Sequence, residues 1–264
     1  MKSYLKEMLK RKDLLYYLVK SGLKAEHRNS YLGYFWWLLD PLLNVLVYYF
    51  LVVIVLEREG ENYPLFLVIG LVAWRWISTT INASSRSILR YSSIVNQVAL
   101  PKAIFPLSFT LTQLFNFMFG LIVIAIFLII YGVIPTVHVF YLPLIIVIQL
   151  TAHIALGLVL GYITIFVRDI ENLMTYITRI FFYASPIIWE GGRLLRSGKV
   201  PDWLVPFIEY NPVAILVESY RDILMHHQAP DLVALGVLFV ISIVVIIYML
   251  NYYSKNEHKI IKAL

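Results

Sequence analysis

The feature that most constrains this chain is a set of six apolar blocks, each long enough to cross the roughly 30 Å hydrocarbon core of a membrane. Lipid offers no partner to backbone N–H and C=O groups, so each block is expected to be a helix. The fifth block is interrupted by Arg179 and Pro186. The sequence predicts an all-α polytopic membrane protein with six transmembrane helices, at about 31–56, 63–81, 104–131, 140–167, 173–189 and 232–253.

Composition supports a membrane protein and excludes several other classes. Hydrophobic residues make up 60% of the chain and charged residues 14%, against about 25% charge in soluble domains. This excludes disorder, collagen-like repeats and a nucleic-acid partner for the net charge of +6. The chain has no cysteine, which excludes disulfides, thiolate metal sites and thiol catalysis.

Lysine and arginine gather on one set of loops. They are frequent before the first block, between the second and third, and after the sixth, whereas the opposite loops carry most of the acidic residues. Cytoplasmic loops are enriched in basic residues. We therefore expect both termini of this multi-pass protein to be cytoplasmic.

Residues 1–30 have apolar side chains at helical spacing and lysines on the other face. This pattern predicts an amphipathic helix on the inner membrane surface, held by its apolar stripe and by anionic lipid. A solvated basic tail is the alternative. The transmembrane domain then occupies residues 31–264.

Residues 190–226 are too polar to span the membrane and too apolar for a free loop, so we expect two short helices at the outer face. Asn211 and Pro212 are typical of an N-cap followed by proline in the first turn. Helical spacing puts Glu218, Arg221 and Asp222 on one face. The opposite, apolar face contains Val213, Leu216, Val217, Tyr220 and Leu224.

Sites for nucleotide or metal are not expected. The string GGRLLRSGKV (191–200) has the wrong glycine spacing for a phosphate-binding loop, and Val200 stands where Ser or Thr is required. Adjacent His226 and His227 point about 100° apart on a helix and lack a carboxylate at ligand spacing. Asp40 and Arg75 are the ionisable residues deepest within the blocks. We expect them to face the bundle interior or water, although Arg75 could also snorkel to the interface.

Four stretches resemble the membrane-spanning permeases of ABC exporters for cell-surface polysaccharides. They are Lys10–Tyr49, with its Asp40–Pro41 pair; Ser92–Ser108; FVRDIENLM (166–174); and SPIIW (185–189) followed by NPVAILVESYRDILM (211–225). The family's Tyr-Arg-x-Ser motif appears here as Glu26-His27-Arg28-Asn29-Ser30, which is a departure from the pattern.

The resemblance implies a half-transporter with no catalytic site or cofactor of its own. Two copies of the chain would pair around a conduit for a lipid-linked polysaccharide, and two separate ATPase subunits would bind ATP and Mg²⁺. Among the relatives we favour teichoic acid as the substrate, with O-antigen or capsular polysaccharide as alternatives. A membrane-embedded enzyme acting on lipid-linked glycans is an alternative of a different class, but we find no convincing pair of carboxylates for it. An ATP-independent channel would need no docking loop.

The resemblance also assigns expected roles to positions. Residues 92–101 would form a coupling helix seated in the ATPase, and the Arg168–Asp169 turn a second contact, although Asp169 could act only as a helix cap. The outer gate would include Pro186, Trp189, Asn211 and Pro212. In the coupling helix Ser92 or Ser93 would cap, Pro101 would terminate, and the apolar face would contain Ile94, Val95 and Val98.

Aromatic residues are 15% of the chain, and many lie within the blocks. Sugar rings have apolar C–H faces that can stack on aromatic rings, so aromatic side chains could line a path for a polysaccharide. Ordinary core packing is the alternative. The candidates are Trp37, Tyr48, Phe181 and Tyr183, from the first and fifth blocks.

Overall fold

The described part of the chain is built from helices, without β-strands. A computed structural model describes residues 2–27, 30–55, 62–93, 100–192, 201, 203 and 205–264. Five of its helical segments are long and apolar enough to cross a membrane: Gly33–Val55, Tyr63–Ser85, Ile104–Ile130, Val137–Phe166 and Leu232–Ala263. The prediction of an all-α polytopic membrane protein is confirmed.

These segments correspond to labelled elements. The first contains α3 (Trp36–Tyr49) and ends in a π-helical stretch, Phe50–Val55. The others are α4 (Tyr63–Ser85), α7 (Ile104–Ile130), α8 (Leu142–Phe166) and α13 (Leu232–Ala263).

Helix α4 lies at the centre of the bundle. In its most apolar stretch 72% of the residues are buried, against 17% in α13. A span that faces lipid can be apolar on every side, whereas α4 also carries polar residues, and it packs against α3, α7, α8, α9 and α12. It contacts α7 closely at Gly120, where an added Cβ would be 2.5 Å from a methyl carbon of Val72.

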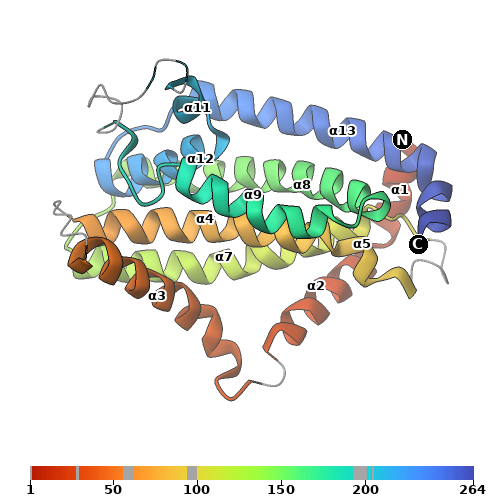
Figure 1. Cartoon of the computed structure of the whole chain (residues 1–264), viewed down its shortest axis with the longest axis horizontal. Coiled ribbons are helices and arrows are strands. Elements are labelled where there is room, and N and C mark those ends of the chain that lie inside the picture. The colour runs from red at the N-terminus through yellow and green to blue at the C-terminus, as the bar shows by residue number, and fades with distance from the viewer. Residues whose placement is uncertain are drawn as a thin grey trace.

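The predicted fifth span differs from the structure. Helix α9 (Ile170–Ala184) has 15 residues, or about 22 Å, which is short of a hydrocarbon core. It ends at Ala184, two residues before Pro186. Nevertheless, α9 runs along most of the bundle beside α4 and α8, and both chain termini lie at the same end of the bundle (Figure 1). We call this the terminal end.

The N-terminal residues form two helices, α1 (Lys2–Lys10) and α2 (Lys12–His27). Tyr4 and Leu18 are buried, and other apolar side chains of both helices pack beside them. Helix α1 contacts α13, and α2 contacts α7. The basic side chains on these helices are mostly exposed. The N-terminal segment is therefore a packed amphipathic element, and its place on a membrane surface stays a prediction.

Two short helices follow α9 in sequence, as expected for residues 190–226. They are α11 (Val205–Glu209) and α12 (Pro212–Arg221), which continues as a π turn, Asp222–His226. Asn211 is the N-cap of α12, and its Oδ1 accepts a hydrogen bond from the Val213 N–H at 2.9 Å. The expected apolar face of α12 is buried. Arg221, on the opposite, polar face, is buried as well, with 0% exposure.

A substitution at Gly70 tests the close packing around α4. An added Cβ would lie 2.5 Å from Nη2 of Arg221 and 2.8 Å from the carbonyl oxygen of Ile187. We expect Gly70→Ala to destabilise the purified protein by about 1–3 kcal/mol through overpacking, measured as unfolding in detergent. Gly236→Ala is the matched control, because its Cβ meets nothing within 4 Å. Equal stability of the two variants would contradict this packing.

Candidate functional site

A polar cavity of about 510 Å³ lies beside the central helix, between α3, α4 and α9. Side chains from all three helices face it. They are Asp40, Pro41, Asn44 and Tyr48 from α3; Leu71, Val72, Trp74, Arg75, Ser78, Thr79 and Asn82 from α4; and Thr175, Thr178, Arg179, Phe182 and Tyr183 from α9.

Helical spacing places these residues on common faces. Residues three or four apart lie on the same side of a helix. Asp40, Asn44 and Tyr48 follow this spacing on α3, and the polar residues of α4 begin at Arg75 and continue through Ser78, Thr79 and Asn82. Each helix therefore presents a polar stripe to the cavity, although its sequence is apolar overall.

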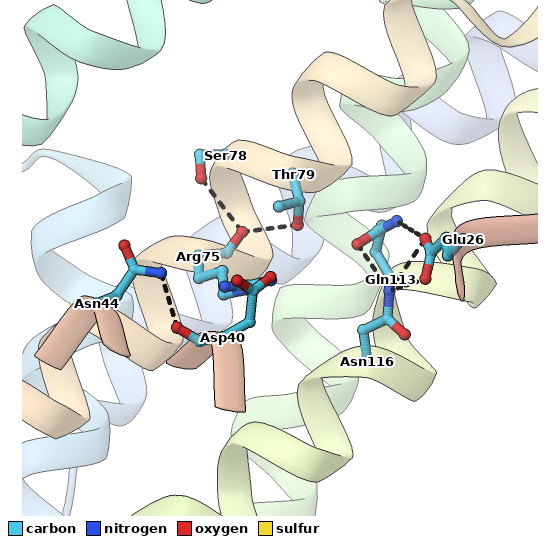
Figure 2. Close-up of polar contacts among 8 residues, drawn as sticks. All are labelled: Glu26, Asp40, Asn44, Arg75, Ser78, Thr79, Gln113 and Asn116. Atoms are coloured by element: carbon cyan, nitrogen blue, oxygen red, sulfur yellow. Dashed lines mark hydrogen bonds and ion pairs between the residues drawn. The ribbon is translucent and has the colours of Figure 1, made fainter. Parts of the chain in front are cut away.

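The ionisable residues of this cavity include an ion pair. Arg75 Nη2 contacts Asp40 Oδ2 across the gap between α4 and α3 (Figure 2). Side chains of Arg75 and Asp40 are 36% and 42% exposed, so the pair faces the cavity. Asn44 Nδ2 donates to the Asp40 carbonyl oxygen at 2.8 Å. The expectation that both residues face the interior or water is met, and Arg75 pairs with Asp40 within the cavity.

Aromatic rings from all three helices also line the cavity. The Phe182 ring centroid lies 5.2 Å from that of Tyr48, 5.1 Å from that of Tyr183 and 5.8 Å from that of Trp74. Trp189 Nε1 donates to the Tyr183 carbonyl oxygen at 3.1 Å. The cavity thus combines charged and amide groups with aromatic rings in one lining.

The four aromatic residues predicted for a substrate path lie in different places. Tyr48 and Tyr183 line the cavity. Trp37 packs instead against Phe115 and Phe119 of α7, with centroids 5.3 and 4.9 Å apart. Phe181 is 43% exposed and is not among the lining residues. The structure therefore brings two of the four candidates together.

A second polar cluster joins α2 to α7. Glu26 accepts hydrogen bonds from Gln113 Nε2 at 3.2 Å and from Asn116 Nδ2 at 3.0 Å (Figure 2). Glu26 is the first residue of the segment in which this sequence departs from the family's Tyr-Arg-x-Ser motif. At this position the chain uses a carboxylate to hold the end of α2 against the bundle.

Arg221 fastens α12 to the bundle at the end opposite the termini. Nη1 donates to the Pro186 carbonyl oxygen at 2.6 Å and to Glu218 Oε1 at 2.9 Å. Nη2 donates to the carbonyl oxygens of Ile187 at 2.7 Å and Phe66 at 3.3 Å. Burial lowers the pKa of Arg221 to about 10, and Glu218 opposes this shift, so the guanidinium remains charged at neutral pH.

Trp189 donates to the Tyr183 carbonyl oxygen, whereas Pro186 and Asn211, also predicted for the outer gate, lie at the turn that binds this arginine. Pro186 supplies one of its acceptors, and Asn211 Nδ2 donates to Ser185 Oγ at 2.7 Å. Pro212 occupies the first turn of α12. The turn after α9 and the start of α12 therefore form one hydrogen-bonded junction, and its role as a gate stays a prediction.

The predicted coupling residues that the structure describes lie at or near the terminal end. Ser92 and Ser93 are helical, and Pro101 is buried just before α7; Ile94, Val95 and Val98 lie outside the described residues. Asp169 occupies the N-cap position of α9, after Arg168, but its side chain accepts no capping hydrogen bond from the described backbone. Nearby, Arg86 Nε contacts Glu171 Oε1 at 2.9 Å, which joins the end of α4 to α9.

Comparison with known proteins identifies the family. Residues 13–225 match the ABC-2 type transporter family. The chain belongs to this family. The O-antigen export system permease protein RfbA of Myxococcus xanthus is 31% identical over 91% of each chain. A protein of the same name from Klebsiella pneumoniae is 27% identical over 96% of this chain and 95% of its own.

Family membership fixes the division of labour expected from the resemblance. This ABC-2 type protein is the permease subunit of a polysaccharide-exporting ABC transporter, and it is a multi-pass membrane protein. It is not itself catalytic and has no cofactor of its own, because a separate ATPase subunit binds and hydrolyses the nucleotide. The alternatives of a membrane enzyme and of an ATP-independent channel are excluded.

The names of the relatives do not support the substrate that we expected from the sequence. All three curated relatives carry the name O-antigen export system permease protein. The sequence-based preference for teichoic acid finds no support among them, and the O-antigen alternative fits better. Motifs shared across polysaccharide permeases identify the class of machine but do not distinguish the polymers.

Several cavity residues of this ABC-2 permease were missed from sequence. Asn44, Ser78, Thr79, Asn82 and Thr178 were not singled out. The available signal was polar side chains at three- and four-residue spacing within otherwise apolar helices. Such a stripe within a span indicates a face turned away from lipid.

Substitution of Arg221 tests the junction at the end opposite the termini. We expect Arg221→Met to lower the free energy of unfolding by about 3 kcal/mol or more, because several buried carbonyl groups and Glu218 lose a charged donor. Arg221→Lys keeps the charge but loses the planar fork, so we expect an intermediate loss. Reversible unfolding in mixed detergent measures both. Native stability of Arg221→Met would show that these hydrogen bonds do not hold α12.

Proposed function

We propose that this permease exports a lipid-linked polysaccharide of the O-antigen class across the bacterial plasma membrane, with both termini in the cytoplasm. The names of the three relatives support the substrate class. The excess of lysine and arginine on the loops at the terminal end supports the orientation. The exposed basic side chains of α1 and α2 suit an anionic lipid surface.

The observation that carries this proposal is the mixed lining of the cavity. Planar polar groups suit the hydroxyls of a sugar, and aromatic rings suit its C–H faces. Here the Arg75–Asp40 pair, Asn44 and Asn82 line the same cavity as Tyr48 and Tyr183. Polar and ionisable residues within membrane spans are rare and often mark a substrate or ion pathway. The lining therefore fits a path along which a hydrated polymer moves.

A second copy of the chain would complete the path. The cavity lies between α3 and α9, and both helices also expose apolar side chains. On α3 these include Leu46 and Val47, and on α9 Tyr176 and Ile180. Two copies related by a two-fold axis would meet through the same surface on each. Pairing through α3 and α9 would place both cavities along one central conduit.

Energy would enter at the terminal end. We assign ATPase docking to residues 92–101, with the Arg168–Asp169 turn as a second contact. Leu100 and Pro101 are buried where this segment leads into α7, and the Arg86–Glu171 pair joins α4 to α9 close to the second contact. Displacement of the second contact would therefore reach α4 and α9, which line the cavity, and displacement of the first would reach α7, which packs against α4.

Replacement of the cavity rings tests the substrate path. We expect Tyr48→Leu and Tyr183→Leu each to slow export several-fold, since stacking on an aromatic ring contributes on the order of 1 kcal/mol. Export of lipid-linked polysaccharide by the transporter in membrane vesicles measures this, with basal ATP hydrolysis as the check on assembly. Phe140→Leu is the control, because Phe140 is 81% exposed and outside the cavity. Native export by both tyrosine variants would refute the path.

The docking assignment is tested by placing charge in the proposed contact. We expect the double substitution Val95→Asp and Val98→Asp to leave membrane insertion unchanged, because both residues lie outside the apolar blocks. Burial of carboxylates against the ATPase would be unfavourable, so co-purification of the ATPase and export should both be lost. A double variant that still retains the ATPase would place docking elsewhere.

A further inference from the structure

Glu257 connects three parts of the chain that are distant in sequence. Its Oε1 accepts hydrogen bonds from the Tyr4 hydroxyl and from the backbone N–H of Lys102, both at 2.9 Å. The Ala103 N–H in turn donates to the Tyr4 oxygen at 3.3 Å. One carboxylate thus joins α13, α1 and the turn that leads into α7.

A break in α13 places this carboxylate. Asn256 has non-helical backbone angles within α13 (φ −117°, ψ 15°), and its Nδ2 donates to the Tyr252 carbonyl oxygen at 3.0 Å. The helix therefore changes direction just before Glu257. After the break Ile260 is fully buried in the same apolar cluster as Tyr4 and Ala103. The last turns of α13 are folded against the bundle at the terminal end.

The chemistry of the junction suits a fixed joint. Backbone N–H groups at the start of a helix lack intrahelical acceptors, and a negative charge there is also favoured by the helix dipole. Glu257 and Tyr4 satisfy two such groups just before α7. Burial raises the pKa of the Tyr4 hydroxyl, and Glu257 adds to this, so the phenol remains a donor at neutral pH. Burial lowers the pKa of Lys102, against the effect of Glu257.

The hydrogen bonds of Glu257 and Tyr4, which we call the joint, lie next to the proposed docking segment. Residues 102 and 103 directly follow the segment that we assign to ATPase docking, and Leu100, Lys102 and Ala103 are buried. A push on that segment has to pass through this turn to reach α7. Because the turn is hydrogen-bonded to α13 and α1 as well, displacement at the docking segment would move these helices together with α7.

We propose that Glu257 is a positioning residue that couples the ATPase-docking segment to α13 and α1. This inference rests on the proposed docking at 92–101. Tyr4 acts with Glu257, because its hydroxyl oxygen accepts a hydrogen bond from the Ala103 N–H of the same turn. Loss of the joint would allow the ATPase to bind and turn over while less of its motion reached the membrane helices.

The test measures export and ATP hydrolysis in one preparation of the full transporter in proteoliposomes. We expect Glu257→Ala to retain the ATPase but to lower the amount exported per ATP by about threefold or more. Tyr4→Phe should give a smaller decrease, because the Lys102 contact remains. Glu257→Gln keeps an oxygen acceptor and should restore the ratio close to native. His258→Ala, at the exposed neighbouring position, is the control and should leave the ratio unchanged.

A purely structural role would lower export and ATP hydrolysis together and leave their ratio native, and this result would overturn the proposal. If Glu257→Ala does not assemble, Tyr4→Phe decides by the same ratio. The Val95 and Val98 double variant separates the two proposals. If it keeps the ATPase, the docking assignment fails. If it loses the ATPase while Glu257→Ala and Tyr4→Phe have the native ratio, only the role of Glu257 fails.

Discussion

The rest of the structure depends on the enclosure of α4. A helix inside a bilayer satisfies its own backbone, but α4 is also surrounded by other helices over most of its length. Its first half is apolar on every side, and this half holds the bundle together. Its second half carries Arg75 and the polar residues that follow, which lipid would not tolerate. Because neighbouring helices already shield α4 from lipid, it can present a polar face to a cavity.

Features set by local pattern could be predicted from sequence. The long apolar segments, the cap at Asn211 and the buried face of α12 depend on composition and helical period, and they agree with the structure. Features set by packing could not be predicted. Period placed Arg221 on a polar face, but the turn after α9 covers that face and supplies the carbonyl groups that the guanidinium binds. Likewise the sequence shows that Asp40 and Arg75 are ionisable residues within apolar segments. Only the packing of α3 on α4 shows that they form an ion pair.

The aromatic residues show the same division within the site. Residue type alone made Trp37 and Tyr48 equal candidates for a substrate path. Both lie on α3, but Trp37 meets the rings of α7, whereas Tyr48 meets Phe182 beside the cavity. Which neighbour a ring faces depends on how α3 crosses α4 and α7 at each level. The helical period of the sequence therefore cannot predict which neighbouring helix a ring contacts.

The two ends of the permease are joined by short, rigid connections. Arg75 lies about 15 Å along α4 from Ser85, and the next residue, Arg86, is paired with Glu171 of α9. Helices α4 and α9 are thus tied at the terminal end, line the cavity further along, and are connected again beyond it, where Arg221 binds the carbonyl oxygens of Phe66 and Ile187. Two helices held at both ends can change their separation most between the attachments, where the cavity lies. A small displacement at the terminal end would therefore alter the width of the cavity, and no residue of the cavity would need to contact the ATPase.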